Sequence, residues 1–96
     1  VSEFSYQDEL YWFYSIINLD GSNSLFISAP NFINIQAIQN IPPSFIDKIE
    51  PQENGIYKIF QNLGNTNSQE QTIISINLLR FLDNPDNDII DYHHSS

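Results

Sequence analysis

The sequence predicts a β-rich α+β domain, either a mostly antiparallel sheet or a small sandwich, with one or two short helices. Apolar and polar residues alternate along several segments, which is the period-2 pattern of half-buried strands. Turn signals such as Asp20-Gly21 and Asn54-Gly55 separate these segments and are typical of hairpins. The 96 residues, 41% of them apolar, provide for one domain (1–96) with one modest core.

The strongest hairpin signal lies in residues 10–29. A two-residue loop Asp20-Gly21 in a type I′ turn places both residues at positive φ. This loop sets the register, because a shift of one residue moves every side chain to the other face. The pairs expected to face the core are Ile16–Leu25, Tyr14–Ile27 and Trp12–Ala29. Tyr11 and Phe13 then fall on the opposite, mixed face, covered by a helix or exposed to a partner.

The segments on either side of this hairpin leave alternatives open. Residues 4–8 lead into the hairpin as one bent strand, or as a strand followed by a bulge near residues 7–9. A short N-terminal helix is the second interpretation. Residues 30–40 fit a helix that begins at Pro30 or a strand, and their β-branched content favours the strand.

A helical turn is expected over residues 45–49. Ser44 is a suitable N-cap for it, and Pro51 is expected to end it. Asn54-Gly55 then forms a turn, since these residues readily adopt left-handed conformations.

The second half of the chain is expected to continue as strands. Residues 56–63 form one strand and residues 64–70 a polar loop. Residues 71–82 form the last long strand, which is apolar on both faces and therefore belongs in the middle of a sheet or between a sheet and a helix. An acidic turn at residues 83–88 precedes an edge strand at residues 89–92.

Charge is the most informative number in the composition. Twelve acidic residues against three basic ones give a net charge of −9. Phosphate contacts need Lys and Arg, so neither nucleic acid nor an anionic membrane is an expected partner. The charge suits a basic protein or a cation, although solubility alone also accounts for it. The lack of cysteine favours a reducing compartment.

No catalytic or cofactor motif is present, so we expect no enzyme and no cofactor. The two histidines, His93 and His94, are adjacent near the end of the sequence, and the neighbouring carboxylates of Asp8 and Glu9 point to opposite faces of a strand. The aspartates of residues 83–91 lack the glycine and the closing glutamate of a calcium loop. A solvated acidic turn without metal is therefore preferred, and a calcium-stabilised β-module stays as an alternative.

The acidic residues of segments 47–53 and 83–91 are the candidate binding site. We hypothesise that both segments lie at one end of the sheet and form a negative patch for a basic partner. The expected contact residues are Asp47, Glu50, Glu53, Asp83, Asp86, Asp88 and Asp91, with Tyr92 or Tyr11 as an aromatic anchor.

A small, cysteine-free, strongly acidic, aromatic-rich domain resembles the immunity proteins that bacteria make against their own nuclease toxins, in particular those of contact-dependent growth inhibition. The resemblance covers the whole chain as size, charge and composition. It implies a cytoplasmic antitoxin, a monomer that forms a heterodimeric complex with the basic catalytic domain of a cognate toxin. The alternative expectation is an extracellular or virion β-domain that binds carbohydrate or another subunit.

Overall fold

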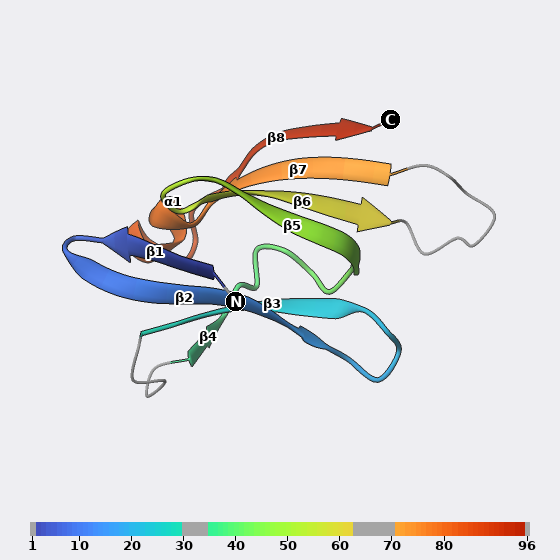
Figure 1. The fold of residues 1–96 in the computed structure, drawn as a ribbon, viewed down its shortest axis with the longest axis horizontal. Helices are drawn as coiled ribbons and strands as arrows, with labels where there is room; N and C mark the ends of the chain where they lie inside the picture. Colours follow the sequence, from blue (N-terminus) through green and yellow to red (C-terminus); the bar gives the residue numbers. More distant parts are fainter. Residues whose placement is uncertain (1, 30–34, 63–70, 96) are drawn as a thin grey trace.

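The computed structural model describes residues 2–29, 35–62 and 71–95. Within these ranges the chain forms two four-stranded antiparallel sheets and one short helix (Figure 1). The first sheet has the order β1-β2-β3-β4, with bounds Ser2–Tyr6, Glu9–Ile17, Asn23–Ser28 and Ile35–Ala37. The second has the order β5-β6-β7-β8, with bounds Phe45–Glu53, Ile56–Asn62, Gln71–Asn77 and Ile90–Ser95. Helix α1, Leu78–Asp83, follows β7. The predicted β-rich, antiparallel α+β fold is confirmed.

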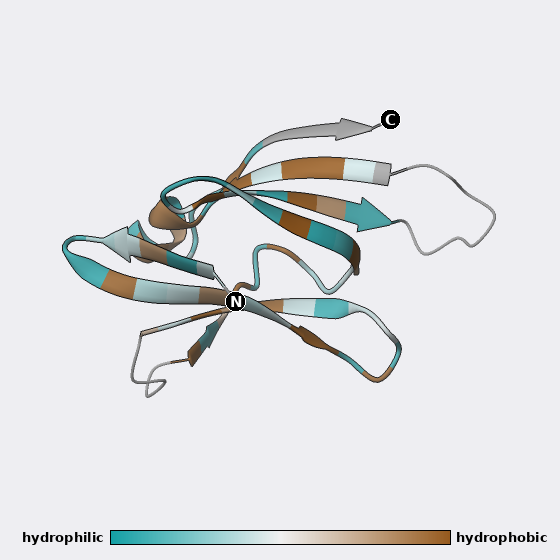
Figure 2. Cartoon of the chain, in the orientation of Figure 1, coloured by the Kyte–Doolittle hydropathy of each residue, from teal (hydrophilic) through white to brown (hydrophobic). Residues whose placement is uncertain are grey.

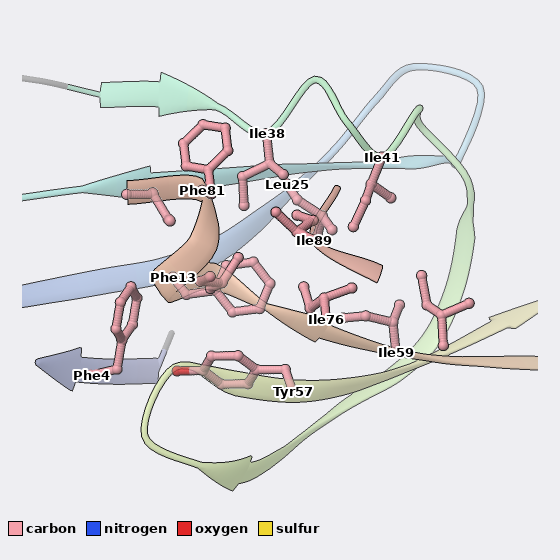
Figure 3. Packing of buried hydrophobic residues seen from close by; sticks show 13 residues of the cluster. Phe4, Phe13, Leu25, Ile38, Ile41, Tyr57, Ile59, Ile76, Phe81 and Ile89 are labelled. Atoms are coloured by element: carbon pink, nitrogen blue, oxygen red, sulfur yellow. The ribbon is translucent and has the colours of Figure 1, made fainter. Parts of the chain in front are cut away.

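The two sheets pack face to face around one apolar core (Figure 3). Phe13 of the first sheet and Tyr57 of the second have ring centroids 4.6 Å apart, and Phe4 meets the same tyrosine edge-on at 6.4 Å. Along β6 and β7, hydrophobic stretches are interrupted by more polar ones (Figure 2). In β6 the buried Tyr57 and Ile59 are separated by the exposed Lys58, which is the period-2 burial of a strand. The other buried apolar residues are Leu25, Ile27, Ile38, Ile41, Ile59, Ile74, Ile76, Leu78, Phe81 and Ile89.

The hairpin at residues 10–29 forms, but its loop is longer than predicted. Gly21 has a φ of 91°, whereas Asp20 is not among the residues with positive φ, so a type I′ turn is excluded. The Gly21 N–H donates to the Asn18 carbonyl at 3.0 Å, and the Asn18 N–H donates to the Ser22 carbonyl at 2.7 Å. This is a three-residue loop that ends in a left-handed glycine, a common alternative to the two-residue turn.

The longer loop shifts the register of the hairpin by one residue. The predicted pairs Ile16–Leu25, Tyr14–Ile27 and Trp12–Ala29 are wrong, and the observed pairs are Ile16–Ser24, Tyr14–Phe26 and Trp12–Ser28. Phe13 is consequently buried in the core, while Ile16 is 48% exposed. Tyr11 lies on the same face as Phe13 and packs against the core. The predicted register had placed both residues on the mixed face, away from the core.

The expected bulge near residues 7–9 is a complete chain reversal. Tyr6 pairs with Glu9, and the two residues between them, Gln7 and Asp8, have φ values of 49° and 64°. Two successive left-handed residues are the signature of a type I′ turn, here formed without glycine. Residues 4–8 therefore belong to a separate strand and turn, not to a bent continuation of β2.

The helical turn expected at residues 45–49 is wrong, because these residues begin the long strand β5. Ser44 does not cap a helix but bridges to Asn23, whose N–H donates to the Ser44 carbonyl at 2.7 Å. Pro51 does not end the segment either. It lies within an edge strand, where a proline is tolerated, and register shifts occur at Ile46/Lys48 and Pro51/Glu53.

The strand expected over residues 71–82 is correct only to Asn77. The Asn77 side chain accepts the Leu79 N–H at 3.0 Å and so caps α1, in which the buried Leu78 and Phe81 follow helical spacing. β7 does lie in the middle of its sheet, as predicted, and β8 is an edge strand.

The remaining expectations fall partly on described residues. The strand expected at residues 56–63 is confirmed as β6. Residues 35–37 of the ambiguous segment form a strand, whereas residues 30–34 and the expected loop at residues 64–70 lie outside the described residues. Across the described ranges, no helix has the length and apolar character needed to cross a bilayer.

Candidate functional site: an acid-rimmed groove

Three connections meet at one end of the sandwich: the β1–β2 turn, the β5–β6 turn and the segment after α1 (Figure 1). Hydrogen bonds join them. Ser5 exchanges two hydrogen bonds with the Asn54 side chain, at 2.8 and 2.7 Å. The neighbouring Tyr6 hydroxyl donates to the carboxylate of Asp83. These contacts place both sheets and the helix in a fixed relationship at this end.

This end of the sandwich carries most of the described carboxylates. The sequence has twelve acidic residues, of which Glu70 lies outside the described residues. Six of the remaining eleven lie in or directly beside the three connections, and all six are exposed. We call this group the acidic end: Asp8, Glu9, Glu53, Asp83, Asp86 and Asp88.

The three basic residues do not neutralise the acidic end. Arg80 lies in α1 and forms an ion pair with Asp91 of β8. Lys48 of β5 lies 3.8 Å from Glu50 and 4.6 Å from the centre of the Phe60 ring. Lys58 of β6 is the register partner of the same Glu50. The surplus negative charge of the protein is therefore concentrated where the three connections meet.

A groove runs between the first sheet and the segment after α1. It consists of two adjoining cavities of about 680 and 440 Å³, which share Gln36, Phe81 and Pro85. Volumes of this size are typical of ligand sites. The apolar lining is Tyr11, Ile27, Ala29, Ala37, Phe81, Leu82 and Pro85, and the polar lining is Glu9, Gln36, Gln39, Asn40, Asp86, Asn87 and Asp88. We call it the acid-rimmed groove.

The wall formed by residues 84–89 is braced by side-chain hydrogen bonds. Asn40 donates from Nδ2 to the carbonyls of Pro85, at 3.0 Å, and of Asn87, at 2.6 Å. Asn87 donates from Nδ2 to the Arg80 carbonyl at 2.9 Å. One carboxylate oxygen of Asp88 accepts the Ile90 N–H at 3.1 Å. The carboxylates on this wall are thus carried by backbone that is tied to the β4–β5 connection, to α1 and to β8.

Tyr11 and Glu9 line the other part of the groove. The Tyr11 hydroxyl donates to Glu9 Oε2 at 3.2 Å. Burial raises the pKa of Tyr11 above its usual value of 10.0, and the hydrogen bond and charge of Glu9 raise it further. Tyr11 therefore stays neutral at physiological pH and presents a ring and a hydroxyl, while Glu9 provides the charge.

The structure brings some of the predicted contact residues together and separates others. Tyr11, Asp86 and Asp88 line the groove, and Glu53 and Asp83 belong to the acidic end. The expected joint patch of segments 47–53 and 83–91 is not formed as a whole, because β5 and β8 are opposite edges of the second sheet.

The other predicted contact residues lie elsewhere. Asp47 is six residues before Glu53 along an extended strand, a separation of about 20 Å. Glu50 is next to Lys48, and Asp91 is paired with Arg80. Tyr92 lies in β8, where its backbone pairs with Ser75 of β7, and nothing is described of its side chain.

Several groove residues were not predicted as a site. Glu9 was considered only as the neighbour of Asp8, and Gln36, Asn40 and Phe81 carried no functional signal. These residues come together only in the folded structure, because β2, β4 and α1 are separated by long stretches of chain. In the described part of the chain, no group of three or more His, Asp or Glu side chains is arranged to hold a metal ion, and this includes the aspartates of residues 83–91.

Comparison with known proteins assigns no family: no protein-family model, no curated protein and no solved structure matches the chain. The protein is therefore described by its fold and its groove, as a small two-sheet β-rich domain with a negatively charged groove at one end.

Proposed function

We propose that the protein is an acidic inhibitor of a basic protein, acting as an immunity protein does on a nuclease toxin domain. The observation that supports it is the acidic end with its six exposed carboxylates, three of which (Glu9, Asp86 and Asp88) line a groove that no described lysine or arginine lines. A nuclease must be basic to hold phosphates, so an inhibitor can present carboxylates where the phosphates would sit. In this proposal the protein has no catalytic activity of its own.

The charge arrangement has a kinetic consequence for the proposed complex. Carboxylates concentrated at one end steer a basic partner towards that end and raise the association rate constant. The attraction is screened beyond about 8 Å at physiological ionic strength. We therefore expect a one-to-one complex whose association is fast at low salt and much slower at high salt. Since a nuclease toxin acts on intracellular nucleic acid, we expect the complex in the cytoplasm.

The proposal is tested with the catalytic domain of a toxin encoded beside the gene of this protein. Association is followed by stopped-flow fluorescence at about 50 mM and about 500 mM NaCl. At these concentrations the Debye length is about 14 Å and about 4 Å, respectively, so the second screens the charges much more strongly. The test variant is Asp86→Lys. Glu3→Lys makes the same change of charge on β1, outside the acidic end, and is the matched control.

The expected result is an association rate constant that falls at least about tenfold for Asp86→Lys and less than about twofold for Glu3→Lys. Circular dichroism and thermal unfolding confirm that both variants are folded. Equal losses for the two variants would place the interface elsewhere. No association of the wild-type protein with the basic domain at either salt concentration would contradict the proposed function.

Carbohydrate binding is the second candidate function. It is favoured by the side-chain amides of Gln36, Gln39 and Asn40, which line the groove together with Tyr11. Amide groups and an aromatic ring are suited to sugar hydroxyls and sugar faces. Salt dependence separates the two candidates, because binding of a neutral glycan does not weaken as ionic strength rises.

A further inference from the structure

We infer that the acid-rimmed groove binds an arginine side chain, the guanidinium lying between the carboxylates and the aliphatic stem lying on the apolar lining. The inference deepens the proposed function and rests on it for the source of that arginine, a basic protein partner. Binding to the groove can be measured without that partner, with a blocked arginine as the ligand.

The charge of the groove selects a cation. Glu9 lines one cavity, and Asp86 and Asp88 line the other. Arg80 is the nearest basic residue along the chain, and its guanidinium is directed to Asp91 of β8. A cationic ligand therefore meets carboxylates that have no lysine or arginine beside them in the described lining of the groove.

The shape and polarity of the lining favour a cation on a long aliphatic stem. Phe81 and Pro85 line both cavities, and Leu82 and the Tyr11 ring extend the apolar surface beside Glu9. Long basic side chains bury their methylene groups on such surfaces while the charged head stays among polar groups. A planar guanidinium also stacks on aromatic faces better than a hydrated ammonium does, which favours arginine over lysine.

Asn40, Asp86 and Asp88 provide hydrogen-bond acceptors at the groove. Asn40 uses its Nδ2 on the carbonyls of Pro85 and Asn87, which leaves Oδ1 as its acceptor. Asp88 uses one carboxylate oxygen on the Ile90 N–H, which leaves the other. Arginine has five N–H donors and no acceptor, so its donor set complements these groups and the carboxylate of Asp86.

The groove is also largely preformed. Asn40, Asn87 and Asp88 each fix the wall of residues 84–89 by a hydrogen bond, and Asn84 Oδ1 accepts the Asp86 N–H at 3.0 Å. A site that is already ordered loses little conformational entropy when a ligand binds. Even a small ligand, such as one blocked arginine, should therefore bind measurably.

The probe is N-acetyl-argininamide, titrated into the isotopically labelled full chain and followed by amide NMR spectra. Its two comparison ligands are N-acetyl-lysinamide and N-acetyl-citrullinamide, the second being a neutral shape analogue of arginine. We expect amide shifts confined to residues 9–11, 36–40 and 80–90, with a Kd of about 1–10 mM, the range typical of a fragment-sized ligand. Lysine should bind at least about threefold more weakly, and citrulline should give no localised shifts.

Two variants identify the groups that hold the probe. Asp86→Asn and Tyr11→Ala should each weaken arginine binding at least about threefold, since one removes the charge and the other the ring. Glu50→Gln removes a carboxylate that lies beside Lys48, away from the groove, and should leave the Kd unchanged. The dispersion of the amide spectrum shows whether each variant is folded, and Asp86→Asn alone decides the result if Tyr11→Ala is not.

The outcomes separate this inference from the proposed function. Equal affinity for arginine and lysine, shifts outside the groove, or no shifts up to about 100 mM would overturn the assignment of an arginine site. If the toxin domain nevertheless binds and Asp86→Lys weakens it, the proposed function stands without the arginine site. If arginine binds in the groove but no basic domain associates, the arginine site stands and the proposed function fails.

Discussion

Asn54 acts as a strand partner for Ser5, although the two residues are 49 positions apart. The Ser5 N–H donates to Asn54 Oδ1 at 2.8 Å, and Asn54 Nδ2 donates to the Ser5 carbonyl at 2.7 Å. One side-chain amide thus satisfies both backbone groups of a residue on the edge strand β1. Because Asn54 belongs to the β5–β6 turn, the same pair of bonds fastens the first sheet to the second.

Replacing Asn54 should therefore destabilise the whole sandwich. Asn54→Ala removes both of these bonds and a third, which the Ser5 hydroxyl donates to Asn54 Oδ1 at 3.3 Å. The substitution should lower the free energy of unfolding by about 1–2 kcal/mol, measured by urea denaturation. Gln52→Ala, at an exposed position of β5, is the control and should cost less than about 0.5 kcal/mol. Equal effects of the two substitutions would show that the Ser5–Asn54 contact contributes little.

Gly55 should not tolerate any side chain. Its φ is 76°, and a Cβ atom there would lie 2.9 Å from Leu79 Cγ and Cδ2 and 3.5 Å from Phe4 Cδ2. Gly55→Ala combines a left-handed alanine with a clash against α1, so we expect a loss of about 2–4 kcal/mol of unfolding free energy.

Gly21 provides the matched control for that prediction. Its φ is 91°, but a Cβ atom there would only approach the exposed Phe45 ring, at 3.4 Å. Gly21→Ala should therefore cost only the conformational strain, about 1–2 kcal/mol. Thermal unfolding of both variants measures the difference, and a larger loss for Gly21→Ala would contradict the packing described at Gly55.

The stability of the protein should fall at alkaline pH. The hydrogen bond to Asp83 raises the pKa of Tyr6 above its usual value of 10.0, and burial and the charge of Asp83 add to the shift. The folded state thus favours the protonated phenol, and this stabilisation is complete below pH 10.0 and is lost as the pH rises through the higher folded value. Tyr6→Phe should make the decline in the melting temperature above pH 10.0 less steep.

The opposite dependence should appear in acid at the β2–β3 loop. Asp20 accepts hydrogen bonds from the Ser22 hydroxyl at 2.6 Å and the Ser22 N–H at 2.9 Å, and these bonds lower the pKa of Asp20 below its usual value of 3.8. The stabilisation is present above pH 3.8 and is lost as the pH falls through the lower folded value. NMR titration of Asp20 measures that pKa directly, and Ser22→Ala should move it back towards 3.8.

The sequence predicted hairpins better than it predicted their registers. The dipeptide Asp20-Gly21 indicates a turn correctly, but it fits both a two-residue loop and a three-residue loop with glycine last, and these differ by one residue of register. Gln7-Asp8 forms a tight turn that lacks the expected glycine. At residues 45–49, pairing with β6 outweighs the local preference for a helical turn. At residues 78–83, the Asn77 cap and the burial of Leu78 and Phe81 at helical spacing favour a helix over the predicted strand.

The groove was only partly predictable. Tyr11, Asp86 and Asp88 were chosen from the sequence for their charge or aromatic character, and all three line it. Nothing in the sequence indicated that Glu9 would join them. Its strand partner Tyr6 is hydrogen-bonded to Asp83 of α1, a contact between segments 77 positions apart. Asp47 and Glu50 were expected to share the site, but they lie six and three residues before Glu53 along β5. An extended strand rises about 3.3 Å per residue, so both lie at a distance from the acidic end.

The irregular edge of β5 affects how the protein behaves when it is concentrated. A chain composed largely of strands is at risk of fibril growth wherever a sheet ends in a straight, unprotected strand. β5 has two register shifts and a proline, and β1 has Asn54 bound to its backbone. Both edges are therefore poor templates for the next copy, so storage at high concentration should seed little polymerisation from these two sides.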